Sequence, residues 1–211
     1  MPPLPTSSLS RWRKQRGFTL IELMVVVVII AILAVIAVPL FAARFQEQRV
    51  RQNAQRIAEI YRGARARALG RGAAILVQKT GGTIRVLEGV QGSSGSTLAE
   101  TTNCGNLPTR GCITNNWGNV GSGSTIGTAR ELSSFSLTDG LSSTTTFGGA
   151  APDTLNICFS PAGLTWVNTG TTWSSLNWAP MQGAASISVT KTGNLKYDVI
   201  VLPNGSARLG K

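Results

Sequence analysis

The sequence predicts an α+β fold in which one long N-terminal α-helix packs on a C-terminal antiparallel β-sheet head. Three observations lead to this fold class. Residues 18–38 form an apolar run of membrane-spanning length, residues 39–71 continue with helical periodicity, and residues 72–211 contain short β-rich runs separated by glycine-containing turns. Residues 1–17 precede the helix as a basic leader.

The apolar run 18–38 has the length of a single membrane span. It is interrupted only by Thr19 and Glu22, and at about 1.5 Å rise per residue it crosses a bilayer core of about 30 Å. The run is too long for a secretory signal peptide and no small-x-small cleavage motif follows it, so the sequence predicts a retained anchor. Glu22 is unexpected here, because a carboxylate costs about 3 kcal/mol at a bilayer centre. Four basic residues precede the run: Arg11, Arg13, Lys14 and Arg16.

Residues 39–71 have the pattern of an amphipathic second half of the same helix. Apolar or small side chains recur at alternating spacings of four and three residues, which places them in one stripe: Val50, Ala54, Ile57, Tyr61, Ala64 and Ala68. We expect this stripe to face the sheet. Beside it lies a run of arginines at positions 44, 49, 51, 56, 62, 65, 67 and 71. The run is interpreted either as a solvated face that pairs with acidic residues of neighbouring subunits, or as a contact for lipid head groups or DNA.

The head begins with a hairpin at residues 73–90, where two apolar runs flank a Gly-Gly turn. Residues 154–168 form a second hairpin around a Pro-Ala-Gly turn, and residues 185–209 form three further strands. Residues 91–154 are rich in Gly, Ser, Thr and Asn and are interpreted either as loop-heavy β structure or as a partly disordered insertion. For Trp117 within it, burial in the core is favoured over an exposed contact.

The composition argues against catalysis. The chain has no histidine, its carboxylates are few and scattered, its serines lie in low-complexity loops, and no phosphate-binding loop motif is present. We therefore expect no metal site, no cofactor and no enzymatic activity. The charge balance is strongly basic, with 20 basic residues against 9 acidic ones.

Three cysteines leave one without a partner. Cys104 and Cys112 bracket a short loop containing Gly and Pro, which is an easy ring to close in an oxidising compartment. Cys158 lies in an apolar, strand-like run without the surroundings of a reactive thiol. We expect a Cys104–Cys112 disulfide and a buried free thiol at Cys158.

The junction between leader and apolar run reads RGFTLIEL, and it resembles the class III signal of type IV pilins and type II secretion pseudopilins. The resemblance implies that a prepilin peptidase cleaves between Gly17 and Phe18 and methylates the new N-terminus at Phe18. It also implies that Glu22 is the carboxylate that meets the N-terminal amine of a neighbouring subunit, so that each charge offsets the cost of burying the other. Pro39 stands where pilin helices carry a proline; it is interpreted either as a marker of the membrane exit or, as the resemblance implies, as a helix break.

The resemblance also implies the pilin fold, a topology and a set of partners. Family peptidases act on the cytoplasmic face, so the leader would be cytoplasmic and the head periplasmic. The protein would span the inner membrane once and then enter the pilus, at its tip or its base. The implied partners are other major and minor pilins, the prepilin peptidase and the inner-membrane assembly platform.

Two turns in the head indicate which members of this family the chain resembles most. Its SPAG and LPNG turns resemble those of H-type pseudopilins and FimT/FimU-like minor pilins. The leading interpretation is a minor pilin that primes pilus assembly within an inner-membrane and tip complex. One alternative is an H-type pseudopilin of a type II secretion system. Another is a DNA-binding minor pilin, in which Arg208 and Lys211 would contact the polyanion.

Overall fold

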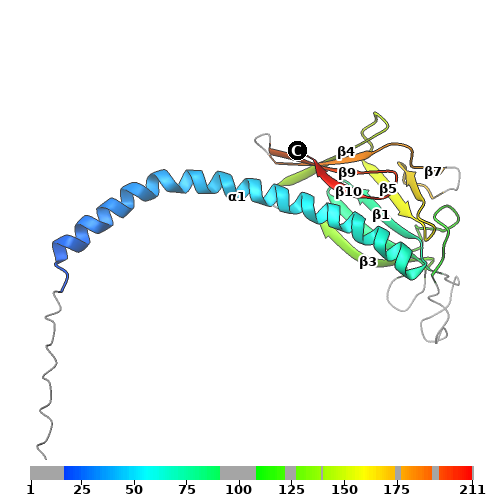
Figure 1. The fold of residues 1–211 in the computed structure, drawn as a ribbon, viewed down its shortest axis with the longest axis horizontal. Helices are drawn as coiled ribbons and strands as arrows, with labels where there is room; N and C mark the ends of the chain where they lie inside the picture. Colours follow the sequence, from blue (N-terminus) through cyan, green and yellow to red (C-terminus); the bar gives the residue numbers. More distant parts are fainter. Residues whose placement is uncertain are drawn as a thin grey trace, which may run out of the picture. The chain divides into compact units, whose positions relative to one another are not determined.

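A computed structural model describes residues 17–90, 108–121, 127–138, 140–173, 177–191 and 195–210. The chain divides into two compact units, residues 1–45 and residues 46–211. The helix α1 spans Leu20–Arg71, so its first part belongs to one unit and its second part to the other. The strands all belong to the second unit (Figure 1).

The strands of residues 46–211 form two antiparallel sheets. One sheet has the order β3-β2-β1-β5-β6-β7 and the other has the order β10-β9-β8-β4. The α+β fold class is thereby confirmed, with a head built from two sheets. The strand bounds are β1 Ile75–Thr80, β2 Thr83–Gly89, β3 Ala129–Ser136, β4 Leu141–Phe147, β5 Thr154–Phe159, β6 Thr165–Asn168, β7 Ala179–Pro180, β8 Ala185–Lys191, β9 Leu195–Val201 and β10 Ala207–Gly210.

The C-terminal end of α1 is set by a glycine. Gly72 has a φ of 68°, a left-handed conformation that glycine adopts without a steric penalty. Its backbone N–H donates to the carbonyl oxygen of Ala68 at 3.1 Å, which is the hydrogen bond of an αL helix cap. The chain can then turn directly into β1.

The helix break expected at Pro39 is wrong for this structure. α1 continues through Pro39 from Leu20 to Arg71. A proline removes one backbone donor, but membrane-type helices tolerate this loss when the surrounding helical hydrogen bonds are kept.

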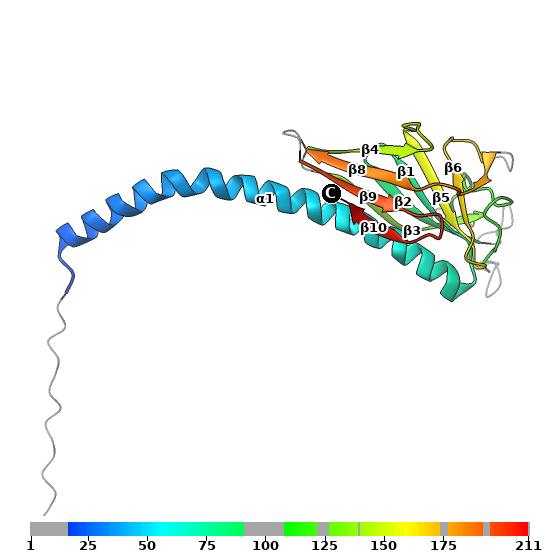
Figure 2. The same ribbon diagram turned by 45° about the horizontal axis from the view of Figure 1, so that its top comes forward.

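The amphipathic stripe of α1 packs on the sheets, as the sequence predicts. Its six residues, from Val50 to Ala68, are buried. They join one hydrophobic core with Val77 and Ile157 of the six-stranded sheet and Val199 of the four-stranded sheet. Figure 2 shows this half of α1 running past β10 and β3. The small alanines of the stripe leave room for the larger side chains of both sheets.

Tyr61 lies at the centre of this core. Its side chain is fully buried, and its hydroxyl has no hydrogen-bond partner among the described residues. Burial raises the pKa of Tyr61, because the charged phenolate would lose its hydration in the core.

The central strands of the six-stranded sheet, β1 and β5, are buried on both faces. Ile75 and Val77 of β1 face the helix-side core, whereas Leu76 between them joins a second core with Trp117 and Trp178. This alternation is the period-2 pattern of a strand. Trp117 is buried, as expected, and its Nε1 donates to the carbonyl oxygen of Cys112 at 2.9 Å. Residues 108–121 therefore cover the sheet face that α1 does not.

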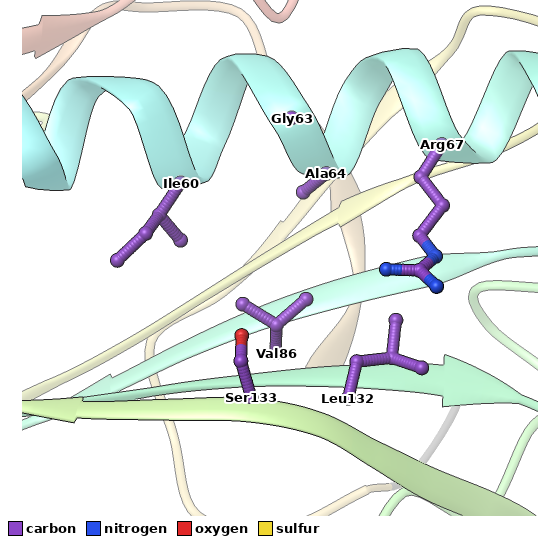
Figure 3. A pocket seen from close by; sticks show the side chains of 7 residues that line it. All are labelled: Ile60, Gly63, Ala64, Arg67, Val86, Leu132 and Ser133. Atoms are coloured by element: carbon purple, nitrogen blue, oxygen red, sulfur yellow. The ribbon is translucent and has the colours of Figure 1, made fainter.

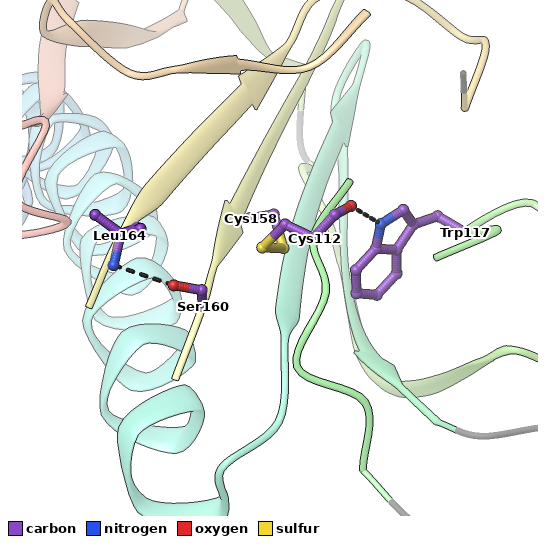
Figure 4. Close-up of a disulfide and its surroundings, with 5 residues drawn as sticks. All are labelled: Cys112, Trp117, Cys158, Ser160 and Leu164. Atoms are coloured by element: carbon purple, nitrogen blue, oxygen red, sulfur yellow. Dashed lines mark hydrogen bonds between the residues drawn. A yellow bond between two sulfur atoms is a disulfide. The ribbon is translucent and has the colours of Figure 1, made fainter. Parts of the chain in front are cut away.

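The disulfide joins Cys112 to Cys158, not to Cys104 (Figure 4). The expected Cys104–Cys112 pairing is wrong, and so is the free thiol at Cys158; Cys104 itself lies outside the described residues. Cys158 is aligned with Leu76 across the β1–β5 pair and so points into the second core. The segment 108–121 brings Cys112 to that face, with 5.8 Å between the two Cα atoms.

The hairpins lie where the sequence places them. β1 pairs with β2, β5 pairs with β6, and β8, β9 and β10 follow one another in the second sheet. In the SPAG turn, Gly163 has a φ of 82° and Ser160 Oγ accepts a hydrogen bond from the backbone N–H of Leu164 at 3.1 Å. β3 and β4 lie within residues 91–154, which agrees with the interpretation of this segment as loop-heavy β structure.

Candidate assembly signal

Gly17 and Phe18 lie just ahead of α1 and are exposed. Phe18 is 80% exposed. A Cβ built on Gly17 would meet no heavy atom within 4 Å, so packing within the chain does not require glycine at this position.

Thr19 caps the N-terminus of α1. Its side-chain Oγ1 accepts a hydrogen bond from the backbone N–H of Glu22 at 3.3 Å, and its carbonyl oxygen accepts the first helical bond from Leu23. Thr19 and Glu22 have the T-x-x-E spacing of a capping box, and the bond to Thr19 Oγ1 satisfies one amide group that the first turn leaves without a partner. The T-x-x-E spacing in the sequence is by itself sufficient to indicate this cap.

Glu22 lies in the first turn of α1 and is exposed. The positive end of the helix dipole favours a carboxylate at this position. The residue therefore has a local role in its own chain as well as a charge that another molecule can reach.

The segment that follows Glu22 presents an apolar surface. Leu20–Ala37 is long and apolar enough to cross a membrane, and none of it is buried inside the protein. Its large side chains are exposed, among them Met24, Ile29 and Leu33. Exposed apolar surface of this extent indicates burial in a membrane or against other proteins.

The same region carries a known sequence motif. Residues 12–38 match the family described as the prokaryotic N-terminal methylation motif. The chain therefore carries an N-terminal methylation motif. It covers the leader end, the Gly17–Phe18 junction, Glu22 and the apolar segment, and it supports the resemblance from which the site residues were inferred.

Solved structures that match over most of the chain have low sequence identity to it. The type IV minor pilin FimU of Pseudomonas aeruginosa, in one crystal form, is 11% identical with a TM-score of 0.40, over 76% of this chain and 92% of FimU. In a second crystal form the identity is 12% and the TM-score 0.42, over 81% of this chain and 92% of FimU. No curated protein sequence matches the chain.

Three of the eight arginines in the run of α1 contact strands of the head. The Arg56 guanidinium lies 4.7 Å from the centre of the Phe135 ring, and Arg62 Nε donates to the carbonyl oxygen of Ala207 at 2.7 Å. Arg71 Nε lies 2.7 Å from a carboxylate oxygen of Glu88. The run is therefore not a uniform solvated face, since these arginines fasten α1 to β3, β10 and β2.

The residues considered for DNA contact do not form a described site. Arg208 is exposed on β10, and Lys211 lies outside the described residues. Among the described residues, no cluster of Cys, Asp and Glu is arranged to hold a metal ion.

Proposed function

We propose that the protein is a minor pilin of a type IV pilus and that it helps to prime pilus assembly as part of an inner-membrane and tip complex. The observation that carries this proposal is the methylation motif of residues 12–38, with an exposed Glu22 in the first turn of an apolar helix. A catalytic role has no comparable support in the sequence.

In this proposal, a prepilin peptidase removes residues 1–17 and leaves an N-methylated amine on Phe18. The amine is the charge that Glu22 of an adjacent subunit meets when the apolar helices pack together. Opposite charges attract far more strongly in an apolar interior than in water, and each alone is costly to bury there. Correct pairing would therefore select one axial register of neighbouring helices.

The proposal places the head in the periplasm, held by the single span until the subunit enters the filament. An oxidising compartment is consistent with the Cys112–Cys158 disulfide. The partners are then other pilins and the inner-membrane platform that assembles them.

Mass spectrometry of the N-terminus tests the processing step. The mature protein should begin at N-methyl-Phe18, whereas Gly17→Val should keep the leader. The valine side chain has open space at this position, so this variant should still fold and insert. A mature protein that retains Met1 in a strain with active peptidase would contradict the proposal.

Shearing of surface filaments tests whether the protein belongs to a type IV pilus or to a type II secretion system. A minor pilin should co-purify with sheared pili in substoichiometric amount. If the processed protein is instead absent from pili and is required for type II secretion, it is an H-type pseudopilin.

A further inference from the structure

A groove of about 300 Å³ lies between α1 and the edge of the six-stranded sheet (Figure 3). Ile60, Gly63 and Ala64 form its helix wall, and Val86 and Leu132 lie opposite on β2 and β3. All of these residues belong to the unit of residues 46–211. The lining is mostly apolar, and β3, which contributes to it, is the edge strand of the six-stranded sheet.

A β-bulge shapes the sheet wall of this groove. The register of β2 and β3 shifts between Val86 and Leu87, so that Val86 is aligned with Ser133 and Leu87 with Glu131. Leu132 is the extra residue, and it lines the groove together with its neighbour Ser133. A regular strand would send these two side chains to opposite faces. Bulges commonly re-aim side chains in this way at sheet edges and binding sites.

Gly63 shapes the helix wall. A glycine inside a helix costs about 1 kcal/mol relative to alanine. A Cβ built on Gly63 would meet no heavy atom within 4 Å, so packing within the chain does not call for glycine here. The missing side chain instead leaves the groove open.

Both ends of the groove are fastened. At one end the Arg56 guanidinium stacks over the ring of Phe135 at the far end of β3. At the other end Glu88 of β2, which is fully buried, forms ion pairs with Arg71 of α1 and Arg130 of β3. The helix is thus held to the edge of the sheet on either side of the groove, and the opening is preformed.

Arg67 gives the groove its charge. Its side chain extends from α1 across the opening toward Leu132 and Val86 (Figure 3). Among the described residues it has no carboxylate partner, whereas Arg71 and Arg130 share Glu88. The surface beside the apolar lining therefore carries excess positive charge.

We propose that this groove is the docking site for a different subunit of the assembly, one that presents an apolar side chain next to a carboxylate. The apolar group would enter between Gly63 and Leu132, and the carboxylate would pair with Arg67. This inference rests on the proposed function as a pilus subunit and names the kind of surface that the head recognises.

Charge complementarity favours another subunit over a second copy of this chain. Removal of residues 1–17 takes away four basic residues and leaves 16 basic against 9 acidic, a formal charge of +7. Two copies would bring like charges together at this groove, whereas an acidic partner would be attracted.

A photo-crosslinking side chain at Gly70 tests the proposal in the full chain, in cells that assemble the filament. Gly70 lies two helical turns beyond Gly63 on the same side of α1, and a Cβ there has open space. We expect a crosslink to another pilin-type subunit, and peptide mapping should find a carboxylate at the contact.

Variants of the groove show whether the crosslink depends on it. Gly63→Leu fills the opening and Arg67→Glu reverses its charge, so each should lower the crosslink yield about tenfold. Gly63→Ala and Arg51→Glu are the matched controls and should leave the yield within about twofold, since Arg51 lies on another side of the helix. In the Arg67→Glu variant, replacing the partner's carboxylate residue with arginine should restore the crosslink yield.

A second crosslinker, placed at Ile29 in the apolar half of α1, distinguishes failure of the groove proposal from failure of the proposed pilus function. Crosslinks from Ile29 with none from Gly70 would overturn the groove proposal and leave the pilus function standing. Crosslinks from neither position would overturn both. A Gly70 crosslink to another copy of this chain, or one unchanged by Gly63→Leu and Arg67→Glu, would also overturn the groove proposal.

Discussion

Thr19 Oγ1 accepts a hydrogen bond from the backbone N–H of Glu22, so the residue expected to pair between subunits is also held by a cap within its own chain. This cap fixes where the helix starts, and hence that Glu22 lies in its first turn. The two roles of Glu22 can be separated by substitution, because one uses its backbone and the other its charge.

Thr19→Val should loosen the first turn of α1. Valine has the same shape but lacks the oxygen acceptor, and loss of an N-cap typically costs about 1 kcal/mol. Hydrogen exchange of the Glu22 amide, measured on the protein in detergent micelles, should become about fivefold faster. Thr19→Ser keeps the acceptor and should leave the exchange rate near that of the wild type. Equal rates in all three proteins would show that the cap contributes nothing.

The disulfide gives a stability prediction. Cys158→Ala removes the bond to Cys112, which closes a loop of 46 residues, and bonds of this kind typically contribute about 2–4 kcal/mol. Thermal unfolding of the oxidised protein should therefore occur at a clearly lower temperature in Cys158→Ala. Cys104→Ser should unfold at the wild-type temperature. A large loss in Cys104→Ser together with none in Cys158→Ala would restore the pairing first expected from the sequence.

Tyr61 should make the stability of the head depend on pH in the alkaline range. Its pKa is raised by burial, above the value of about 10 that tyrosine has in an unfolded chain. The unfolded state therefore releases this proton first, so stability is fully present below about pH 10 and is lost as the pH rises further. Tyr61→Phe should reduce this alkaline loss, measured by denaturant unfolding at several pH values.

At neutral pH the same substitution should cost little. The Tyr61 hydroxyl is buried without a hydrogen-bond partner among the described residues, so its removal leaves no other group unsatisfied. Tyr197 provides the comparison, because its hydroxyl donates to Glu47 at 3.3 Å. Tyr197→Phe should keep the alkaline loss, since Tyr61 is still present. A wild-type pH profile in Tyr61→Phe would refute the role given to Tyr61.

Local patterns in this sequence predict local structure well. The stripe from Val50 to Ala68 is buried because a helical period leaves only one face for the core. The hairpin turns follow from glycines placed between apolar runs, as at Gly81 with its φ of 55°. The assembly signal could also be inferred from sequence, since its residues are contiguous.

Long-range relationships could not be inferred in the same way. The pairing of Cys112 with Cys158 depends on which face of β5 is covered by residues 108–121, and loop length says nothing about that. The groove beside Arg67 depends on a bulge at Leu132, which joins segments that are far apart in the chain. A run of consecutive Ser and Thr residues, 142–146, also concealed β4, because its side chains are mostly polar.

The most direct test of the central claim is the amount of the Glu22→Gln protein in sheared pili, relative to its amount in the inner membrane. Glutamine is also a capping-box residue at this position, so the variant removes the charge while keeping the start of the helix. If Glu22 pairs with the amine of a neighbouring subunit, Glu22→Gln should be inserted and cleaved normally but enter pili about tenfold less than wild type. Incorporation of Glu22→Gln at the wild-type level would contradict the charge-pairing account.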